Sequence, residues 1–108
     1  MAEAPRLILG NYVVLPPDTP KRLVIGNPRI VDHIIRDPKT KLPKVVKALE
    51  WDVYEEDGAP VRKVFRVLSE KLAQALWTLW ERRTGDRICV VIVRHPMDLA
   101  TEYEVRPC

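Results

Sequence analysis

The segment that most constrains the fold is residues 45–68 (VVKALEWDVYEEDGAPVRKVFRVL), which has the pattern of two β-strands joined by a tight turn. Apolar and polar side chains alternate in both halves, with Trp51 on the apolar face of the first half and Phe65 on that of the second. Asp57-Gly58 supplies the turn, because glycine accepts a positive φ that other residues resist. The sequence therefore predicts a long β-hairpin.

Aromatic and cationic side chains lie together on this hairpin. Pairing of alternate positions places Trp51 opposite Phe65, Glu50 opposite Arg66 and Tyr54 opposite Arg62. Platforms for single-stranded nucleic acid combine rings, on which bases stack, with cations that neutralise phosphates. The same pattern is also typical of a core face backed by an ordinary face of ion pairs, and the sequence does not say which rings are exposed.

The net charge of +3 is unevenly distributed. Residues 1–48 contain nine Lys and Arg against four Asp and Glu, whereas residues 49–108 contain nine against eleven. A cationic strip leads into the hairpin and consists of Arg36, Lys39, Lys41, Lys44 and Lys47. Such a strip suits a phosphate backbone. The alternative is a solvated loop and strand edge, where lysines deter aggregation.

The whole chain predicts a single α+β domain with an antiparallel sheet of about four strands and two helices. Residues 27–37 are expected to form the first helix, with Asn27 as N-cap, Pro28 at the first helical position and an apolar stripe that includes Ile30 and Ile34. The order is helix, β-hairpin, helix, β-hairpin after an extended N-terminal segment. We expect residues 1–108 to be one nucleic-acid-binding domain, with residues 1–26 as a looser segment.

The second helix is predicted to follow the first hairpin, with Ser69 as N-cap. Trp77 and Trp80 widen its apolar surface beyond what packing on one sheet requires. Either the N-terminal segment covers this flank or it meets another subunit, since tryptophan is enriched at interfaces. The second reading predicts a homo-oligomer whose interface includes Trp77 and Trp80.

The C-terminal part of the chain predicts a second hairpin. Residues 88–93 (ICVVIV) are apolar throughout, which indicates a strand buried on both faces, and residues 99–106 alternate as a closing strand would. Cys89 lies in the apolar strand and Cys108 is the last residue. Two cysteines form neither a disulfide framework nor a metal-ligand spacing, so we expect two free thiols.

Signals for an enzyme are few. The one serine, Ser69, is placed as a helix cap, and the four glycines form no phosphate-binding loop. Acidic residues around the first turn have the chemistry to bind Mg²⁺, namely Glu50, Asp52, Glu55, Glu56 and Asp57. Pairing with cations on the neighbouring strand, and the preference of turns for acidic residues, account for these acids better than a Mg²⁺ site does. We therefore expect no catalytic activity, cofactor or metal, and the lack of a membrane span or signal peptide favours a cytoplasmic protein.

The aromatic–basic ribbon VVKALEWDVY…VRKVFRVL and the Trp-bearing helix after it resemble the ThermoDBP-related proteins of hyperthermophilic archaea. The composition is similar too, with ten Pro and only one Ser, one Gln and two Asn. The resemblance covers roughly residues 21–95. It implies a four-stranded antiparallel sheet with helices, a dimer or tetramer, and single-stranded DNA held in clefts between subunits without an OB-fold.

We therefore expect largely sequence-independent binding of single-stranded DNA through a basic, aromatic-bearing sheet or cleft. The expected phosphate contacts are Lys39, Lys41, Lys44, Lys47, Arg62, Lys63 and Arg66. The expected stacking surfaces are Trp51, Tyr54 and Phe65. RNA is an alternative ligand, because nothing in the sequence excludes a 2′-hydroxyl. A protein-interaction or assembly module that uses Trp77 and Trp80 is the alternative function.

Overall fold

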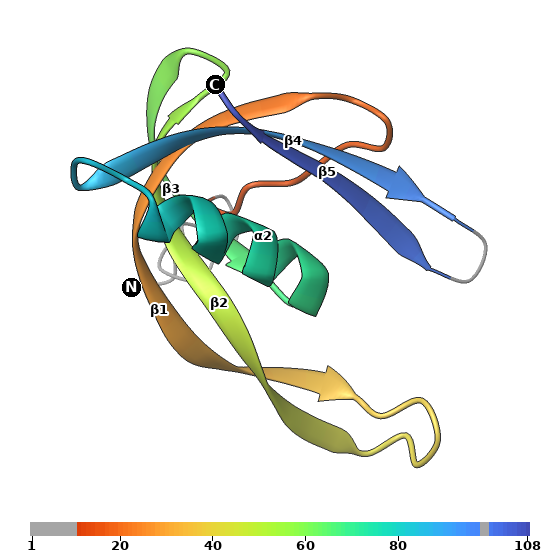
Figure 1. The fold of residues 1–108 in the computed structure, drawn as a ribbon. Helices are drawn as coiled ribbons and strands as arrows, with labels where there is room; N and C mark the ends of the chain where they lie inside the picture. Colours follow the sequence, from red (N-terminus) through yellow and green to blue (C-terminus); the bar gives the residue numbers. More distant parts are fainter. Residues whose placement is uncertain (1–10, 98–99) are drawn as a thin grey trace.

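A computed structural model describes residues 11–97 and 100–108, which form one curled antiparallel sheet with a helix on its concave face (Figure 1). The elements are β1 (Lys21–Arg36), β2 (Pro43–Glu56), β3 (Ala59–Val67), α2 (Glu70–Glu81), β4 (Arg87–Pro96) and β5 (Thr101–Pro107). The strand order is β3-β2-β1-β4-β5, and every neighbouring pair is antiparallel. We call the concave face, which carries α2, the inner face and the convex face the outer face.

The prediction of four strands and two helices is wrong, because the described residues contain five strands and one helix. Residues 27–36, predicted as a helix, form the second half of the 16-residue strand β1. The apolar residues that suggested a helical stripe instead alternate, with Ile30 and Ile34 on one face and Val31 and Ile35 on the other. All four are β-branched, which favours an extended backbone, and pairing with β2 satisfies that preference.

A bulge in the middle of β1 explains this alternation. Gly26 pairs with Asp52 and Arg29 pairs with Glu50, so one more residue is inserted in β1 than in β2. Asn27 has a positive φ of 52° at this point, and Pro28 has no N–H to donate to a neighbouring strand. The bulge changes which positions face inward. Ile25 belongs to the buried core, whereas beyond the bulge the even-numbered residues lie on the inner face.

The predicted hairpin of β2 and β3 is confirmed. Trp51 pairs with Phe65, and Glu50 pairs with Arg66. Both turn residues have positive φ, 52° for Asp57 and 87° for Gly58, as a two-residue turn matched to the strand twist requires. The expected pairing of Tyr54 with Arg62 is absent, because a second bulge follows Val53.

The core lies between α2 and the inner face of the sheet. Its fully buried side chains are Leu23, Ile25, Trp51, Leu76, Val90 and Ile92. Helix α2 begins after Ser69, as predicted, and the Ser69 hydroxyl accepts a hydrogen bond from the Leu72 N–H (3.3 Å). The apolar strand predicted at residues 88–93 is β4, which lies between β1 and β5.

The N-terminal segment is more ordered than expected over the part that the structure describes. Strand β1 already begins at Lys21, and Val13 and Leu15 contribute to the core. Tyr12 forms a parallel bridge to β3 at Val64, and Pro17 forms one to β4 at Arg94. Residues 11–18 therefore run from the edge of β3 that does not pair with β2 to β4. Residues 1–10 of the expected loose segment lie outside the described residues.

The prediction of two free thiols is wrong, because Cys89 and Cys108 form a disulfide. Antiparallel pairing of β4 with β5 places Val90 opposite Pro107 and so brings the two cysteines side by side, with their Cα atoms 5.3 Å apart. Two cysteines 19 residues apart give no such signal before the strand register is known.

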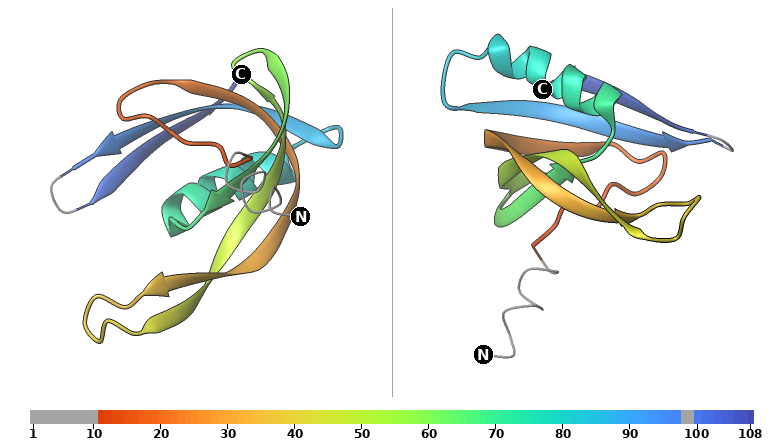
Figure 2. Two further views of the ribbon diagram at one scale, coloured as in Figure 1. Left: turned by 180° about the vertical axis from the view of Figure 1, so that it is seen from behind. Right: turned by 90° about the horizontal axis from the view of Figure 1, so that it is seen from below.

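The order of strands and helix has the connectivity of the OB-fold, a five-stranded, partly open barrel. This differs from the four-stranded sheet that the family resemblance implies. Strand β1 is long enough to pair with β4 and β2 over its first half and with β2 alone over its second half. The end of β1 and the start of β2 lie on the same side of the molecule as the end of β4 and the start of β5 (Figures 1 and 2). Within the described residues, no helix is long and apolar enough to cross a membrane.

Candidate nucleic-acid interface

The second half of β1 and the first half of β2 form a hairpin that extends away from the body of the molecule, the β1–β2 arm (residues 30–47; Figure 1). Four exposed cations lie at its end, and we call them the cationic tip: Arg36, Lys39, Lys41 and Lys44. Among the described residues, no carboxylate lies within ion-pair distance of any of the four. The sequence prediction placed three of these lysines in one site, and the fold does bring them together.

The one acid at the tip, Asp37, organises the turn. Its carboxylate accepts hydrogen bonds from the backbone N–H groups of Lys39 (2.8 Å) and Thr40 (3.4 Å). The Lys41 N–H donates to the Asp37 carbonyl (2.8 Å), and Lys41 has a positive φ of 62°. Backbone groups thus use this carboxylate, and the lysine side chains stay available to a ligand.

Lys47, predicted in the same site, is placed differently. It forms an ion pair with Asp32, its cross-strand neighbour in β1. Both side chains are well exposed, so this pair is weak and competes poorly with a polyanion. Lys47 points to the inner face, together with Leu49, whereas Lys44 points to the outer face.

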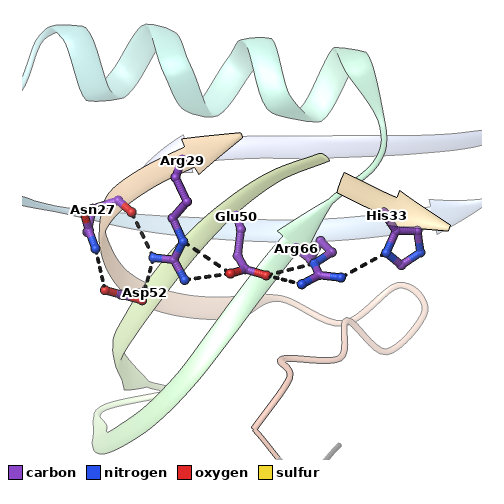
Figure 3. A network of polar contacts seen from close by, with 6 residues as sticks. All are labelled: Asn27, Arg29, His33, Glu50, Asp52 and Arg66. Carbon is purple, nitrogen blue, oxygen red and sulfur yellow. Dashed lines mark hydrogen bonds and ion pairs between the residues drawn. The ribbon is translucent and has the colours of Figure 1, made fainter. Parts of the chain in front are cut away.

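A network of charged and polar side chains covers the outer face where β1, β2 and β3 meet (Figure 3). Glu50 lies at its centre and accepts hydrogen bonds from Arg29 (2.8 Å) and Arg66 (2.8 Å). Arg29 also pairs with Asp52 (2.6 Å), and Arg66 contacts Nδ1 of His33 (3.1 Å). Arg66, predicted as a phosphate contact, is therefore already neutralised by Glu50.

The network keeps Glu50 ionised although the residue is only 8% exposed. Burial alone would raise the pKa of Glu50, but hydrogen bonds and charges from Arg29 and Arg66 outweigh it and hold the pKa below its ordinary value. Glu56 behaves similarly, since Lys63 (2.6 Å) and Lys21 (3.0 Å) lower the pKa of its carboxyl group against the opposing effect of burial. Lys63, another predicted phosphate contact, thus has a carboxylate partner.

The rings predicted to stack on bases are mostly inaccessible. Trp51 is 0% exposed and Phe65 is 4% exposed, so neither offers a face to a base in this structure. Tyr54 is half-buried, and the Arg87 guanidinium lies over its ring, 3.7 Å from the centroid. The expectation of a stacking surface is therefore reduced to Tyr54, together with Tyr12, which lies 5.3 Å from the Arg66 guanidinium.

A second group of cations, not predicted from the sequence as a site, lies at the end of α2. Arg82, Arg83 and Arg87 line a pocket of about 450 Å³ at the end of α2, beside the disulfide. The Arg83 guanidinium lies 3.7 Å from the centre of the Trp80 ring. None of these arginines has an ion-pair partner within the described residues. The sequence signal for this group is the pair Arg82-Arg83 directly after α2, with Arg87 four residues further on.

The two tryptophans predicted at an oligomer interface have different surroundings. Trp80 packs edge-on against Trp51, with ring centroids 5.5 Å apart, and is covered within the chain. Trp77 is 43% exposed and lines an open groove of about 570 Å³ between α2 and the base of the β1–β2 arm. The groove is lined by Pro28, Arg29, Ile30, Leu49, Glu70, Ala73, Gln74, Trp77, Thr78 and Glu81. Its lining is thus largely apolar and includes two acids, Glu70 and Glu81.

Four of the five acids near the first turn, Glu50, Asp52, Glu56 and Asp57, contact cations rather than one another. Asp57 accepts from the Arg22 N–H (3.0 Å) and from Lys21 (3.1 Å), and Asp52 accepts from Asn27 (3.0 Å) and Arg29. In residues 11–97 and 100–108, no three His, Cys, Asp or Glu side chains are grouped as a metal site requires.

No family model, curated protein or solved structure matches this chain. The geometry of the described residues is therefore the basis for the function proposed below.

Proposed function

We propose that this protein binds single-stranded DNA without catalysis and largely independently of sequence, with the cationic tip of the β1–β2 arm as its main phosphate contact. The observation that carries the proposal is the set of four exposed cations that have no carboxylate partner among residues 11–97 and 100–108, on a hairpin that extends from the body. Like charges that lie close together repel one another. A bound polyanion would offset the repulsion among the four cations of the tip.

The connectivity of the sheet supports the same ligand by analogy. OB-folds bind oligonucleotides on the face of strands 2 and 3 and with the loops that join strands 1 to 2 and 4 to 5. The cationic tip occupies the first of these loops, and Arg62 on β3 is an exposed cation that faces no carboxylate partner in the described residues. A fold does not determine a function, and the charges of the cationic tip carry the proposal.

The chemistry of the site favours contact with phosphates over reading of bases. Lysine ammonium groups act as mobile point charges, without the fixed geometry of a guanidinium fork. Residues 30–47, which form the arm, contain no Phe, Tyr or Trp, and the half-buried rings of Tyr54 and Tyr12 lie in the body, away from the tip. We therefore propose weak discrimination among bases. We also propose a cytoplasmic location; the disulfide is compatible with it if the protein comes from a hyperthermophile, whose intracellular proteins can contain disulfides.

Fluorescence anisotropy with labelled oligonucleotides of one sequence, as single-stranded DNA, duplex DNA and RNA, tests the proposal at 50 and 200 mM salt. We expect the single strand to bind more tightly than the duplex. We also expect affinity to fall at the higher salt concentration, because binding releases cations condensed on the DNA and this release is less favourable when more salt is present. If RNA binds more tightly than single-stranded DNA, the proposed ligand is RNA instead of DNA. Absence of binding to all three at 50 mM salt would refute the proposal.

A further inference from the structure

The pocket of about 450 Å³ at the end of α2 has a strongly cationic lining. Arg82, Arg83 and Arg87 line it, and among the described residues no Asp or Glu does. Its other wall includes the disulfide of Cys89 and Cys108, whose backbones are also joined by a hydrogen bond from the Cys108 N–H to the Cys89 carbonyl (3.1 Å). The α2–β4 connection, which contributes to the pocket, lies on the opposite side of the molecule from the cationic tip (Figures 1 and 2).

Aromatic rings hold two of the three guanidinium groups in place. The guanidinium carbon of Arg83 lies 3.7 Å from the centre of the Trp80 ring, and that of Arg87 lies 3.7 Å from the centre of the Tyr54 ring. Stacking of this kind fixes the plane of a guanidinium group and leaves the N–H groups at its edge free to donate. Arg83 uses one of them, since its Nη1 donates to the Trp80 carbonyl (2.9 Å), and keeps the others.

The ring beneath Arg87 depends on a glycine in β1. Gly26 pairs with Arg87 across the β1–β4 ladder. A Cβ atom at Gly26 would lie 2.7 Å from the Asp86 carbonyl oxygen and 3.2 Å from Cε2 of Tyr54. The absence of a side chain at this position therefore lets the Tyr54 ring and the start of β4 approach each other closely, which places Arg87 over the ring.

Stability of the helix accounts for only part of this cluster. Cations after the last turn of a helix interact favourably with its dipole, which accounts for Arg82 and Arg83. Arg87 belongs to β4 and has no such role. None of the three has an ion-pair partner in residues 11–97 and 100–108, so a bound anion would offset the repulsion among them.

We propose that this pocket binds a phosphate group, with Arg83 and Arg87 donating to its oxygens and Arg82 adding a third positive charge. Guanidinium groups bind phosphate through two parallel hydrogen bonds, which the lysines of the tip cannot do. A phosphate group also offers more acceptor oxygens than a carboxylate, which suits a pocket lined by several guanidinium groups. The phosphate is either a monoester, as in a nucleotide or a strand end, or a diester within a strand. The inference does not rest on the cationic tip, because the two sites share no residue.

NMR titration of the full chain tests the proposal, with the arginine Nε–H and tryptophan indole N–H signals as readouts. The probes are thymidine 5′-monophosphate, the dinucleoside monophosphate of thymidine, thymidine itself and acetate. We expect at least one of the two phosphate compounds to shift the signals of Arg83, Arg87 and Trp80. Thymidine should leave them unchanged, and acetate should bind more weakly than the phosphate. Binding of the monoester alone identifies a nucleotide or a strand end as the source, whereas binding of the diester identifies the backbone of a strand.

Substitutions separate the geometry of the site from its charge. We expect Arg83→Gln and Arg87→Gln each to weaken phosphate binding by about tenfold, because each removes charge-assisted hydrogen bonds. Arg83→Lys keeps the charge and should also weaken binding, since an ammonium group lacks the fork of a guanidinium group. Arg22→Gln in β1 is the matched control and should bind as the wild type does. All three arginines are exposed, so the fold should be kept, and the backbone amide spectrum of each variant checks this.

Three results would overturn the proposal. They are unchanged arginine signals with both phosphate compounds, equal weakening by Arg22→Gln and Arg83→Gln, and binding of acetate as tight as that of phosphate. A variant with Lys39→Ala, Lys41→Ala and Lys44→Ala should bind the phosphate compounds at the pocket as the wild type does. Failure of the pocket and failure of the cationic tip are therefore distinguishable.

Discussion

Glu50 is a carboxylate held almost out of water between two arginines. Its pairing with Arg66 follows from the sequence, because alternation in the two halves of the hairpin sets the register. Its pairing with Arg29 does not, because Arg29 was assigned to a helix and reaches Glu50 only through the bulge in β1. The residue-scale prediction was therefore right about one partner and missed the other.

We expect Glu50→Gln to lower the free energy of unfolding by about 1–2 kcal/mol, because two arginines lose their carboxylate partner. This is less than for a fully buried pair, since the Arg29 and Arg66 side chains are 30% and 25% exposed. Urea unfolding at pH 7 measures the loss, and Glu102→Gln on the exposed face of β5 is the control. Equal stability of both variants would contradict the role of the network.

The pH dependence of stability provides a second readout for the same substitution. The pKa of Glu50 is lowered on folding, so its contribution is fully present above its ordinary pKa of 4.5 and is lost as pH falls through the folded-state value. The difference in unfolding free energy between wild type and Glu50→Gln should therefore shrink on the acid side of pH 4.5 and stay constant above it.

At the scale of elements, β1 determines the shape of the molecule. Its β-branched residues fit a helical stripe and a two-sided strand equally well over a short window, and Asn27-Pro28 is as good a helix start as it is a bulge. Only pairing with β2 and β4 decides between them, and that is tertiary information. The hairpin of β2 and β3 needed no such information, because Asp57-Gly58 and strict alternation specify it locally.

Strand β5 pairs with a single strand, packs Tyr103 and Val105 against the core, and is cross-linked to β4 by the disulfide. Cross-linking Cys89 to Cys108 closes a loop with a sequence separation of 19, which corresponds to about 3 kcal/mol of stabilisation. We expect Cys108→Ser to lose about 2–4 kcal/mol in urea unfolding, and wild type treated with a reductant to behave like the variant. The variant itself should be insensitive to reductant. Alkylation of two thiols in the unreduced, unfolded wild type would contradict the cross-link.

At the scale of the whole molecule, the body and the arm have separate roles. The body buries the rings that the sequence suggested for stacking, while the arm presents the lysines that the sequence suggested for phosphates. Sequence patterns identify both sets of residues but do not show which face of the ribbon α2 will cover.

The salt dependence of single-stranded DNA binding, measured for wild type and for two variants of equal net charge, tests the central claim most directly. One variant carries Lys39→Ala, Lys41→Ala and Lys44→Ala at the tip. The control carries Arg22→Ala, Lys71→Ala and Arg106→Ala, three exposed cations elsewhere on the described surface. Both changes remove three positive charges.

We predict that the tip variant binds more weakly and that its slope of log affinity against log salt is smaller in magnitude by about 2, since each phosphate contact contributes about 0.7. The control should keep the wild-type slope. Equal slopes for the two variants would mean that only net charge matters and would contradict the cationic tip as the site.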